Sequence, residues 1–423
     1  MQLYKESDIK FKSNLGLGLL IILTIVFLNT LGPFLQLQKV TTYILVPLLF
    51  LISLKHNYFH PIQNKSELLL TILIFLTSLI SAFTYVNYGH LITGYNRQLS
   101  VILIVFIPLA LNNKYDYTDY FHIGYIVSIL ALIYILYISG QFSFLNFASE
   151  IVQRDKFLIN ANTYSYLMFF ANFSLFYLFQ KYKNKLLLIF LIIIPLLFII
   201  VSFVTQSRSG MLILILSNVI YWLLINRIKN PTKIQKLLRS ISILLILFFL
   251  AFQFWGLYKN SGIKNRVDVT GNRVDARELL IIEAFDVFTE NILFGVGLDQ
   301  IPNYTSIRQF SHNSYVEILA EQGIIGGILL LLLFGIPLRL CLIYLLKNPK
   351  DMVLKLNLLF LIMFYFYNIF YPFYKFGFSM LYFSLIISIQ YKKINTLNNG
   401  PIELSNSIIL QQSNQKNIED SRS

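Results

Sequence analysis

Long apolar segments alternate with short polar segments along almost the whole chain. An apolar run of about 18 residues or more is long enough for an α-helix to cross a membrane. We therefore expect an all-α fold, a polytopic transmembrane bundle of about twelve helices. The expected spans are residues 15–35, 41–54, 67–85, 98–111, 121–139, 163–180, 186–206, 209–226, 240–257, 323–346, 353–371 and 376–390.

The composition supports a membrane protein. The 423 residues are 56% hydrophobic and only 13% charged, whereas soluble domains carry about 25% charged residues. The formal net charge is +14, which in a soluble protein would suggest a nucleic-acid partner. Here most Lys and Arg residues lie in short loops between apolar runs, so their positions indicate membrane topology. We expect no nucleic-acid partner.

The basic clusters fall on one side of the predicted topology. Under the positive-inside rule that side is cytoplasmic, and both termini are cytoplasmic with it. The first apolar segment has no small-residue cleavage site after it, so we expect it to be retained as a helix. The clusters are Lys5, Lys10 and Lys12; Lys55 and Lys65; Lys181, Lys183 and Lys185; Arg227, Lys229, Lys233, Lys236 and Arg239; Lys347 and Lys350; and Lys392 and Lys393.

The same topology divides the chain into four parts. Residues 1–258 hold predicted helices 1–9, residues 259–322 form one long extracytoplasmic loop between helices 9 and 10, and residues 323–391 hold helices 10–12. The loop is far longer than a usual connection of about 4–6 residues, and such loops are often functional. An amphipathic helix is expected at 273–291. The polar tail, 392–423, is predicted to be a disordered cytoplasmic segment.

Arg208 is expected at the outer surface of the membrane. The apolar stretch 186–226 is too long for one helix, and basic clusters flank it on both sides. The chain must therefore turn back on the outer side near Ser207 and Gly210. Two interpretations stay open: an arginine that marks a helix end at the interface, or a functional charge.

His312 is the candidate general base. Its neighbours are polar, it lies in the predicted outer loop, and Ser311 beside it could cap a following helix. Glu317 and Glu321, four residues apart, would share a helix face. An interfacial aromatic residue is the alternative interpretation, but a neutral imidazole is also the commonest general base. The sequence has neither a Walker loop nor a zinc-ligand pair, so we expect neither a metal nor a cofactor.

Several arginines share the outer side with His312. A guanidinium stays charged and grips phosphate oxygens through two hydrogen bonds, which suits a phosphorylated lipid. A base together with a diphosphate clamp is the minimum needed to move a group off a lipid diphosphate. The outer arginines are Arg97, Arg154, Arg208, Arg273 and Arg277.

Three segments together resemble the O-antigen polymerase and ligase superfamily of bacterial membranes. They are ILFGVGLDQ…HNSYVEILAEQGIIGG, TQSRSG and GNRVDARELL, and the similarity covers about 154–327. The resemblance implies transfer of a glycan from an undecaprenyl-diphosphate carrier to an acceptor on the outer face, without a nucleotide sugar or metal. It further implies a multi-pass protein of the bacterial cytoplasmic (inner) membrane. The partners that it implies are membrane lipid, a glycan acceptor and a chain-length regulator.

The resemblance also implies roles for individual residues. His312 is the expected base, and Arg208 and Arg273 are expected to contact the carrier diphosphate. The chain departs from the family at Arg277, where an aromatic residue is common. The residues expected to contact substrate are Asn313, Arg277, Arg154, Asn162, Glu317 and Arg97.

Three functions remain open from the sequence. The leading hypothesis is a polymerase of lipid-linked repeat units in O-antigen, capsule or exopolysaccharide synthesis. An O-antigen ligase that transfers the glycan to a lipid A core or another acceptor uses the same donor, so these residues do not separate the two. A lipid-linked glycan flippase would need a central cavity and often shows repeated halves, and no internal repeat is evident.

Overall fold

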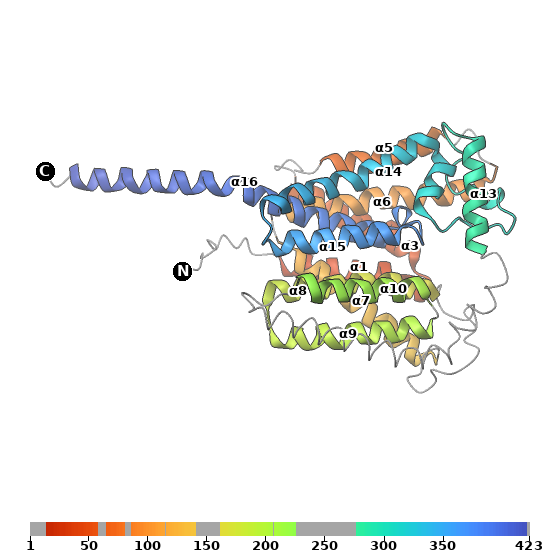
Figure 1. Ribbon diagram of the computed structural model, residues 1–423, viewed down its shortest axis with the longest axis horizontal. Helices are drawn as coiled ribbons and strands as arrows, with labels where there is room; N and C mark the ends of the chain where they lie inside the picture. The colour runs from red at the N-terminus through yellow and green to blue at the C-terminus, as the bar shows by residue number, and fades with distance from the viewer. Residues whose placement is uncertain are drawn as a thin grey trace.

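Helices that run along one common axis make up most of the chain in the computed structural model (Figure 1). The structure describes residues 14–57, 65–80, 86–114, 116–140, 161–205, 207–225 and 276–420. Within these ranges there is no β-strand, which confirms the expected all-α class. The predicted span 240–257, the loop up to residue 275, Arg154 and Arg273 lie outside the described residues.

The helices follow the apolar segments of the sequence. The first half contains α1 (Leu15–Val26), η1 (Phe27–Leu31), α2 (Gly32–Phe34), α3 (Gln38–Val40), η2 (Thr41–Leu45), α4 (Val46–Asn57), α5 (Lys65–Ile80), α6 (Tyr88–Lys114) and α7 (Thr118–Ile138). The second half contains α8 (Ala161–Tyr182), α9 (Lys185–Val204), α10 (Arg208–Ile220), η5 (Tyr221–Ile225), α13 (Ala276–Glu290), η6 (Ile301–Asn303), α14 (Ser314–Lys347), α15 (Met352–Tyr367), η7 (Phe373–Lys375) and α16 (Gly377–Asp420).

Many of these helices are long and apolar enough to cross a membrane. In the described ranges six candidate spans meet both criteria, and α10 and α15 are shorter apolar helices. The chain is thus a multi-pass helical membrane protein. The six are Leu15–Phe34, Gln38–Lys55, Tyr88–Leu111, Thr118–Ile138, Lys185–Val204 and Ser314–Lys347.

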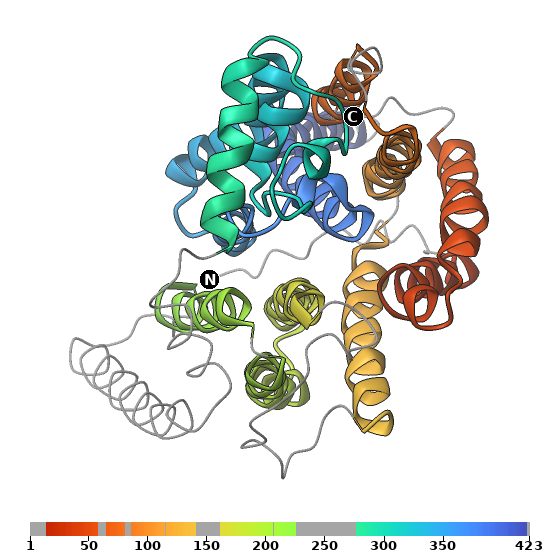
Figure 2. The ribbon, with the colours of Figure 1, turned by 90° about the vertical axis from the view of Figure 1, so that its right-hand side faces the viewer.

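The bundle has two distinct ends. One end is crossed by α13, which lies roughly perpendicular to the other helices; we call it the α13 end (Figures 1 and 2). Ion pairs from Lys181 to Asp116 and Asp119, and from Lys393 to Asp351, lie at the opposite end. These pairs join loops that the sequence predicts on one side of the membrane.

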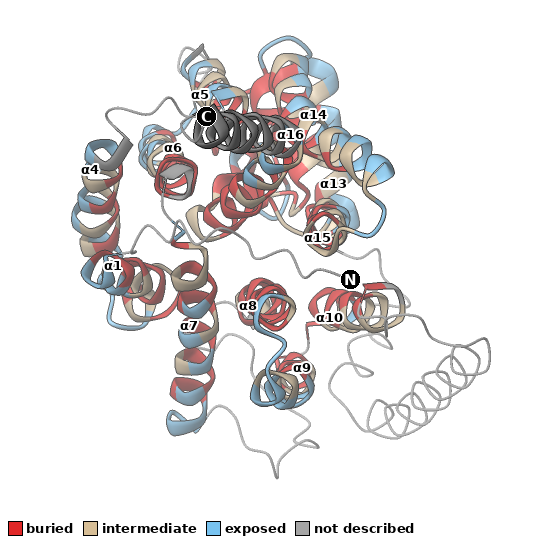
Figure 3. Ribbon diagram, turned by 90° about the vertical axis from the view of Figure 1, so that its left-hand side faces the viewer, coloured by how far each residue is buried: buried red, intermediate tan, exposed pale blue. Residues whose placement is uncertain are grey.

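Helix α8 is the centre of the second half of the bundle. Its residues from Tyr164 to Phe179 are buried without interruption, and α8 contacts α7, α9, α10, α15 and α16 (Figure 3). Aromatic rings fill the space: the ring of Phe170 lies 5.3 Å from that of Tyr382, between centroids. Because lipid is as apolar as these side chains, tight packing rather than the hydrophobic effect holds such helices together.

The polar tail differs from the prediction. In the structure α16 continues as helix to Asp420 and projects beyond the bundle (Figure 1). The packed part of α16 supplies the helix nucleus, which is the costly step, and adding residues to an existing helix is easy. Leu, Glu, Gln and Lys in the tail are also good helix formers. Composition alone suggests disorder because it does not include this nucleus.

Candidate functional site

Helix α14 begins at the α13 end directly after His312. The side chain of Asn313 caps it, because its Oδ1 accepts hydrogen bonds from the backbone N–H groups of Tyr315 (3.0 Å) and Val316 (3.2 Å). The sequence suggested Ser311 as the cap, and that prediction is wrong. Ser311 lies two residues too early in the chain and donates instead to a carboxylate further along the helix.

A break at Gly323 divides α14. Its φ of 66° lies in the left-handed region, where glycine is the residue that fits without strain. The segment 292–297, which follows α13, packs directly against this break. Ile324 N–H donates to the Ile292 carbonyl (2.8 Å), and Gly297 N–H donates to the Glu321 carbonyl (3.0 Å). A Cβ at Gly323 would lie 2.3 Å from backbone atoms of Leu293. The glycine therefore allows two backbones to touch.

A buried cluster of charged side chains lies beside this break. The Lys375 ammonium is 2.5 Å from Glu321 Oε1, 2.9 Å from Glu317 Oε1 and 3.3 Å from Asp299 Oδ1. Asp299 also forms an ion pair with Arg97. The side chains of Lys375 and its three carboxylate partners are at most 4% exposed. We call these five residues the charge cluster; they join α6, the loop before α14, α14 and η7.

The charge cluster keeps Lys375 protonated. Burial alone would lower the pKa of Lys375, but the carboxylates of Glu317, Glu321 and Asp299 outweigh that effect and leave the pKa above its ordinary value. A buried charge is stable only when it is paired and hydrogen-bonded. Lys375 is therefore a cation at every physiological pH, and it holds three separate chain segments at one point.

Glu317 fixes the residues on either side of His312. Its Oε2 accepts hydrogen bonds from the backbone N–H (2.9 Å) and the hydroxyl (2.5 Å) of Ser311. The oxygen of the same hydroxyl accepts a hydrogen bond from the backbone N–H of Asn313 (3.3 Å), the residue that caps α14. His312 lies between these two restrained residues with a φ of 57°, an uncommon value for a residue other than glycine. Its backbone is therefore held in one conformation.

The environment of His312 favours the neutral imidazole. Burial lowers the pKa of His312 below its ordinary value, the positive charge of Arg277 lowers it further, and Glu317 offsets part of the effect. The side chain is half-buried. An imidazole that is neutral near pH 7 can accept a proton, as a general base must.

Arg208 starts α10 close to the start of α8. The hydroxyls of Ser207 and Ser165 are 2.7 Å apart, and Tyr166 on α8 lies with its ring 4.5 Å from that of Tyr371. The carbonyl of Tyr371 accepts a hydrogen bond (3.0 Å) from Ser314, the first residue of α14. Arg208, Asn162 and His312 therefore all lie at the α13 end, where α8, α10 and α14 begin. Helix N-termini favour anions.

The predicted site residues fall into three groups. Arg277 on α13 lies near enough to His312 to lower its pKa, and Asn313 is the adjacent cap. Arg97 and Glu317 are both engaged in the charge cluster, and Glu317 is fully buried. Arg154 and Arg273 lie outside the described residues, so their predicted contacts stay predictions.

Sequence reasoning missed Lys375 and Asp299. Lys375 is one charge in the aromatic segment YPFYKFGF, on the side of the membrane where the positive-inside rule expects few lysines. That exception was the available signal. The predicted shared face of Glu317 and Glu321 is confirmed, because both carboxylates contact the Lys375 ammonium. Within the described ranges, no three His, Cys, Asp or Glu side chains are grouped as metal ligands would be.

Comparison with protein families gives a match to part of the chain. A family described as O-antigen ligase matches residues 194–331, which include Arg208, α13, His312 and the break at Gly323. A comparison with curated proteins gives no match. The family match indicates a membrane glycan-processing function of the O-antigen ligase or polymerase type. Residues 194–331 of this chain are therefore similar to the O-antigen ligase family.

Proposed function

We propose that this protein is a membrane glycosyltransferase that polymerises oligosaccharide repeat units carried on undecaprenyl diphosphate. The observation that supports it most is the restrained His312 at the α13 end, with a lowered pKa and with Arg277 close by. A base and several cations at one membrane surface match the needs of a reaction whose leaving group is a lipid diphosphate.

The proposed reaction moves one glycan and one proton. His312 takes the proton from a hydroxyl of the acceptor sugar as its oxygen attacks the anomeric carbon of the donor. The bond from that carbon to the diphosphate breaks, and its electron pair leaves with the diphosphate. Arg208 and Arg277, with Arg273 in the same proposed role, stabilise the added negative charge. The products are the extended glycan and the free carrier diphosphate.

Glu317 has a different role in this proposal from the one expected from sequence. Both of its oxygens already accept hydrogen bonds from Ser311 or Lys375, so it positions the His312 backbone and does not contact substrate. Arg97 likewise belongs to the charge cluster. Asn313 and Asn162 remain candidates for substrate contact.

The proposal places the α13 end on the outer face of the bacterial inner membrane, where lipid-linked glycans are polymerised. The alternation of basic loops supports this orientation. An O-antigen ligase is the alternative. It would use the same base and clamp, and would differ in the acceptor it receives.

Replacing His312 tests the proposed base. We expect His312→Ala to lower polymer formation by about 10²–10⁴-fold, the usual effect of removing a general base, while the protein inserts at normal levels. The measurement is the ladder of glycan lengths on a gel, with lipid-linked repeats counted beside it. His90→Ala is the matched control, since His90 lies near the start of α6 at the same end. A wild-type ladder in His312→Ala would show that His312 is not the general base.

A further inference from the structure

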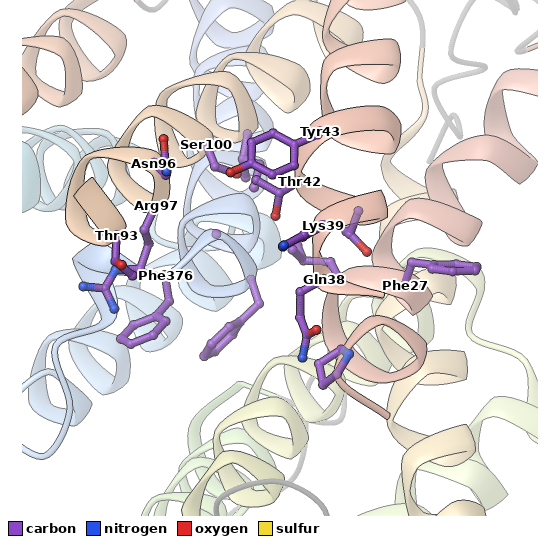
Figure 4. A pocket seen from close by; sticks show the side chains of 16 residues that line it. Phe27, Gln38, Lys39, Thr42, Tyr43, Thr93, Asn96, Arg97, Ser100 and Phe376 are labelled. Carbon is purple, nitrogen blue, oxygen red and sulfur yellow. The ribbon is translucent and has the colours of Figure 1, made fainter. Parts of the chain in front are cut away.

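A cavity of about 470 Å³ lies between the α1–α4 region and α6, and Arg97 of the charge cluster is part of its lining (Figure 4). One wall comes from the α1–α4 region with Phe27, Lys39 and Tyr43, and the other comes from α6 and the start of α16 with Arg97 and Phe376. The volume is within the range of small-molecule sites, about 300–1,000 Å³. The cavity is partly open to the outside of the bundle.

Lys39 is the cation available to a ligand in this cavity. Figure 4 shows its ammonium extending from one wall toward the other. Its side chain is exposed, and among the described residues it makes no ion pair, whereas Arg97 on the opposite wall is paired with Asp299. Lysine is disfavoured in loops on the outer side. An exposed lysine with no ion pair among the described residues is suited to contact an anionic ligand in this cavity.

The lining changes from polar to apolar with depth along α6. Thr93, Arg97, Ser100 and Ile104 line the cavity in this order, at spacings that place them on one helix face. Thr93 is nearest to the α13 end and Ile104 is deepest. On the opposite side Phe27 adds to the apolar part. This gradient fits an amphiphile with an anionic head at the surface and an apolar tail below it.

We infer that this cavity holds the phosphate end of a second polyprenyl-linked substrate, with Lys39 contacting the phosphate. The inference rests on the proposed function: a polymerase must hold a donor carrier, which loses its glycan, and also an acceptor that is itself lipid-linked. The arginines near His312 hold one carrier. The cavity beyond the charge cluster holds the other.

The charge cluster is the shared wall between the two positions. Arg97 lines the cavity and pairs with Asp299, and Lys375 joins Asp299 to Glu317, which holds the loop of His312. In this proposal the buried charge cluster connects the positions of the two carriers. Their phosphates stay apart, and the sugar of each can reach the same outer surface.

A photocrosslinking experiment tests the site with undecaprenyl phosphate as the probe. A photoreactive phenylalanine analogue replaces Tyr43, which lines the cavity, in the full chain reconstituted into phosphatidylcholine nanodiscs. The matched control is the same replacement at Tyr134 on α7, which is 64% exposed and does not line the cavity. We expect an adduct with radiolabelled undecaprenyl phosphate at position 43 and not at 134.

Variants that change the charge of Lys39 test whether its ammonium binds the phosphate of the probe. Lys39→Glu should reduce the position-43 adduct about tenfold or more, as expected for losing a hydrogen bond to a charged group, and Lys39→Arg should retain it. Arg308→Gln, an exposed cation at the same end outside the cavity, should change nothing. An adduct unaffected by Lys39→Glu would overturn the inference, as would equal labelling at position 134.

Competition separates the two sources of a lipid phosphate. Unlabelled undecaprenyl phosphate should displace the probe, and an equal amount of phosphatidylglycerol should not. Equal displacement by both would make this a general anionic-lipid site and refute the acceptor assignment. His312→Ala should leave the adduct intact, because it removes a base and not a binding group. The two proposals are therefore tested separately. An active His312→Ala variant would contradict the proposed polymerase mechanism, whereas the Lys39 variants test the cavity through the adduct.

Discussion

At the scale of single residues, the site combines groups that the sequence could reveal with groups that it could not. His312 and the two glutamates four residues apart follow from local spacing, because one helix face carries both carboxylates. Lys375 lies 54 positions from Glu321 and 76 from Asp299. Local periodicity contains no information about such distant partners, so the ion pairs of Lys375 with Asp299, Glu317 and Glu321 appear only in the fold.

The pH dependence of the reaction should respond in opposite directions to two neighbouring charges. If His312 is the general base, as proposed, the rate falls as His312 becomes protonated, and the acid limb of the profile follows the pKa of His312. Arg277 lowers this pKa and Glu317 raises it. Arg277→Gln should therefore move the acid limb to higher pH, and Glu317→Gln should move it to lower pH while still accepting from Ser311.

Rates at low substrate concentration, measured against pH in purified membranes, report this limb for the free enzyme. Arg308→Gln serves as a control because it removes an exposed charge from the same end. If both the Arg277 and Glu317 variants moved the acid limb in the same direction, His312 would not be the titrating base.

At the scale of the elements, apolar length predicts the helices well and their ends poorly. The expected span 323–346 begins where hydrophobicity rises, but α14 begins at Ser314, nine residues earlier on the sequence, because Asn313 caps it. The glycine at 323 marks a break inside the helix and not its start. Capping and backbone pairing, both local polar effects, set these boundaries.

Gly323→Ala tests the break in α14. The left-handed conformation costs a residue with a Cβ about 1–2 kcal/mol, and here the Cβ would also meet Leu293 backbone at 2.3 Å. We expect a clear loss of thermal stability in detergent and a loss of activity. Gly335→Ala on the same helix is the control, since no atom lies within 4 Å of its added Cβ. The thermal stability of Gly335→Ala should be unchanged or slightly higher. Equal thermal stability of Gly323→Ala and Gly335→Ala would argue against a strained break at Gly323.

At the scale of the whole molecule, the charge cluster joins segments from both halves of the chain. It connects α6 to the region 299–375 through Arg97 and Asp299. The sequence predicts the bundle, and it predicts a helix within 273–291, where α13 lies, because each depends on local composition. The arrangement of these parts around one lysine depends on three-dimensional contacts between distant residues.

Removal of Lys375 should destabilise this whole arrangement. Lys375→Met leaves buried carboxylates without a cation, and breaking a buried pair from one side costs about 3–5 kcal/mol. The expected result is a lower thermal transition in detergent together with lower activity. The double variant Lys375→Met with Glu321→Gln removes one of the stranded charges and should recover part of the stability. No recovery in the double variant would show that the charges do not act as one unit.

The orientation of the bundle decides whether the α13 end can meet lipid-linked glycans outside the cell. Single cysteines at Ser306, exposed at the α13 end, and at Lys350, exposed at the opposite end, can be probed with a membrane-impermeant maleimide in spheroplasts. The native Cys341 is buried and should stay unlabelled. Because the basic loops gather at the end that holds Lys350, we expect labelling at 306 in intact spheroplasts and at 350 only after lysis. Labelling at 350 in intact spheroplasts would place His312 in the cytoplasm, where a carrier facing outward could not reach it.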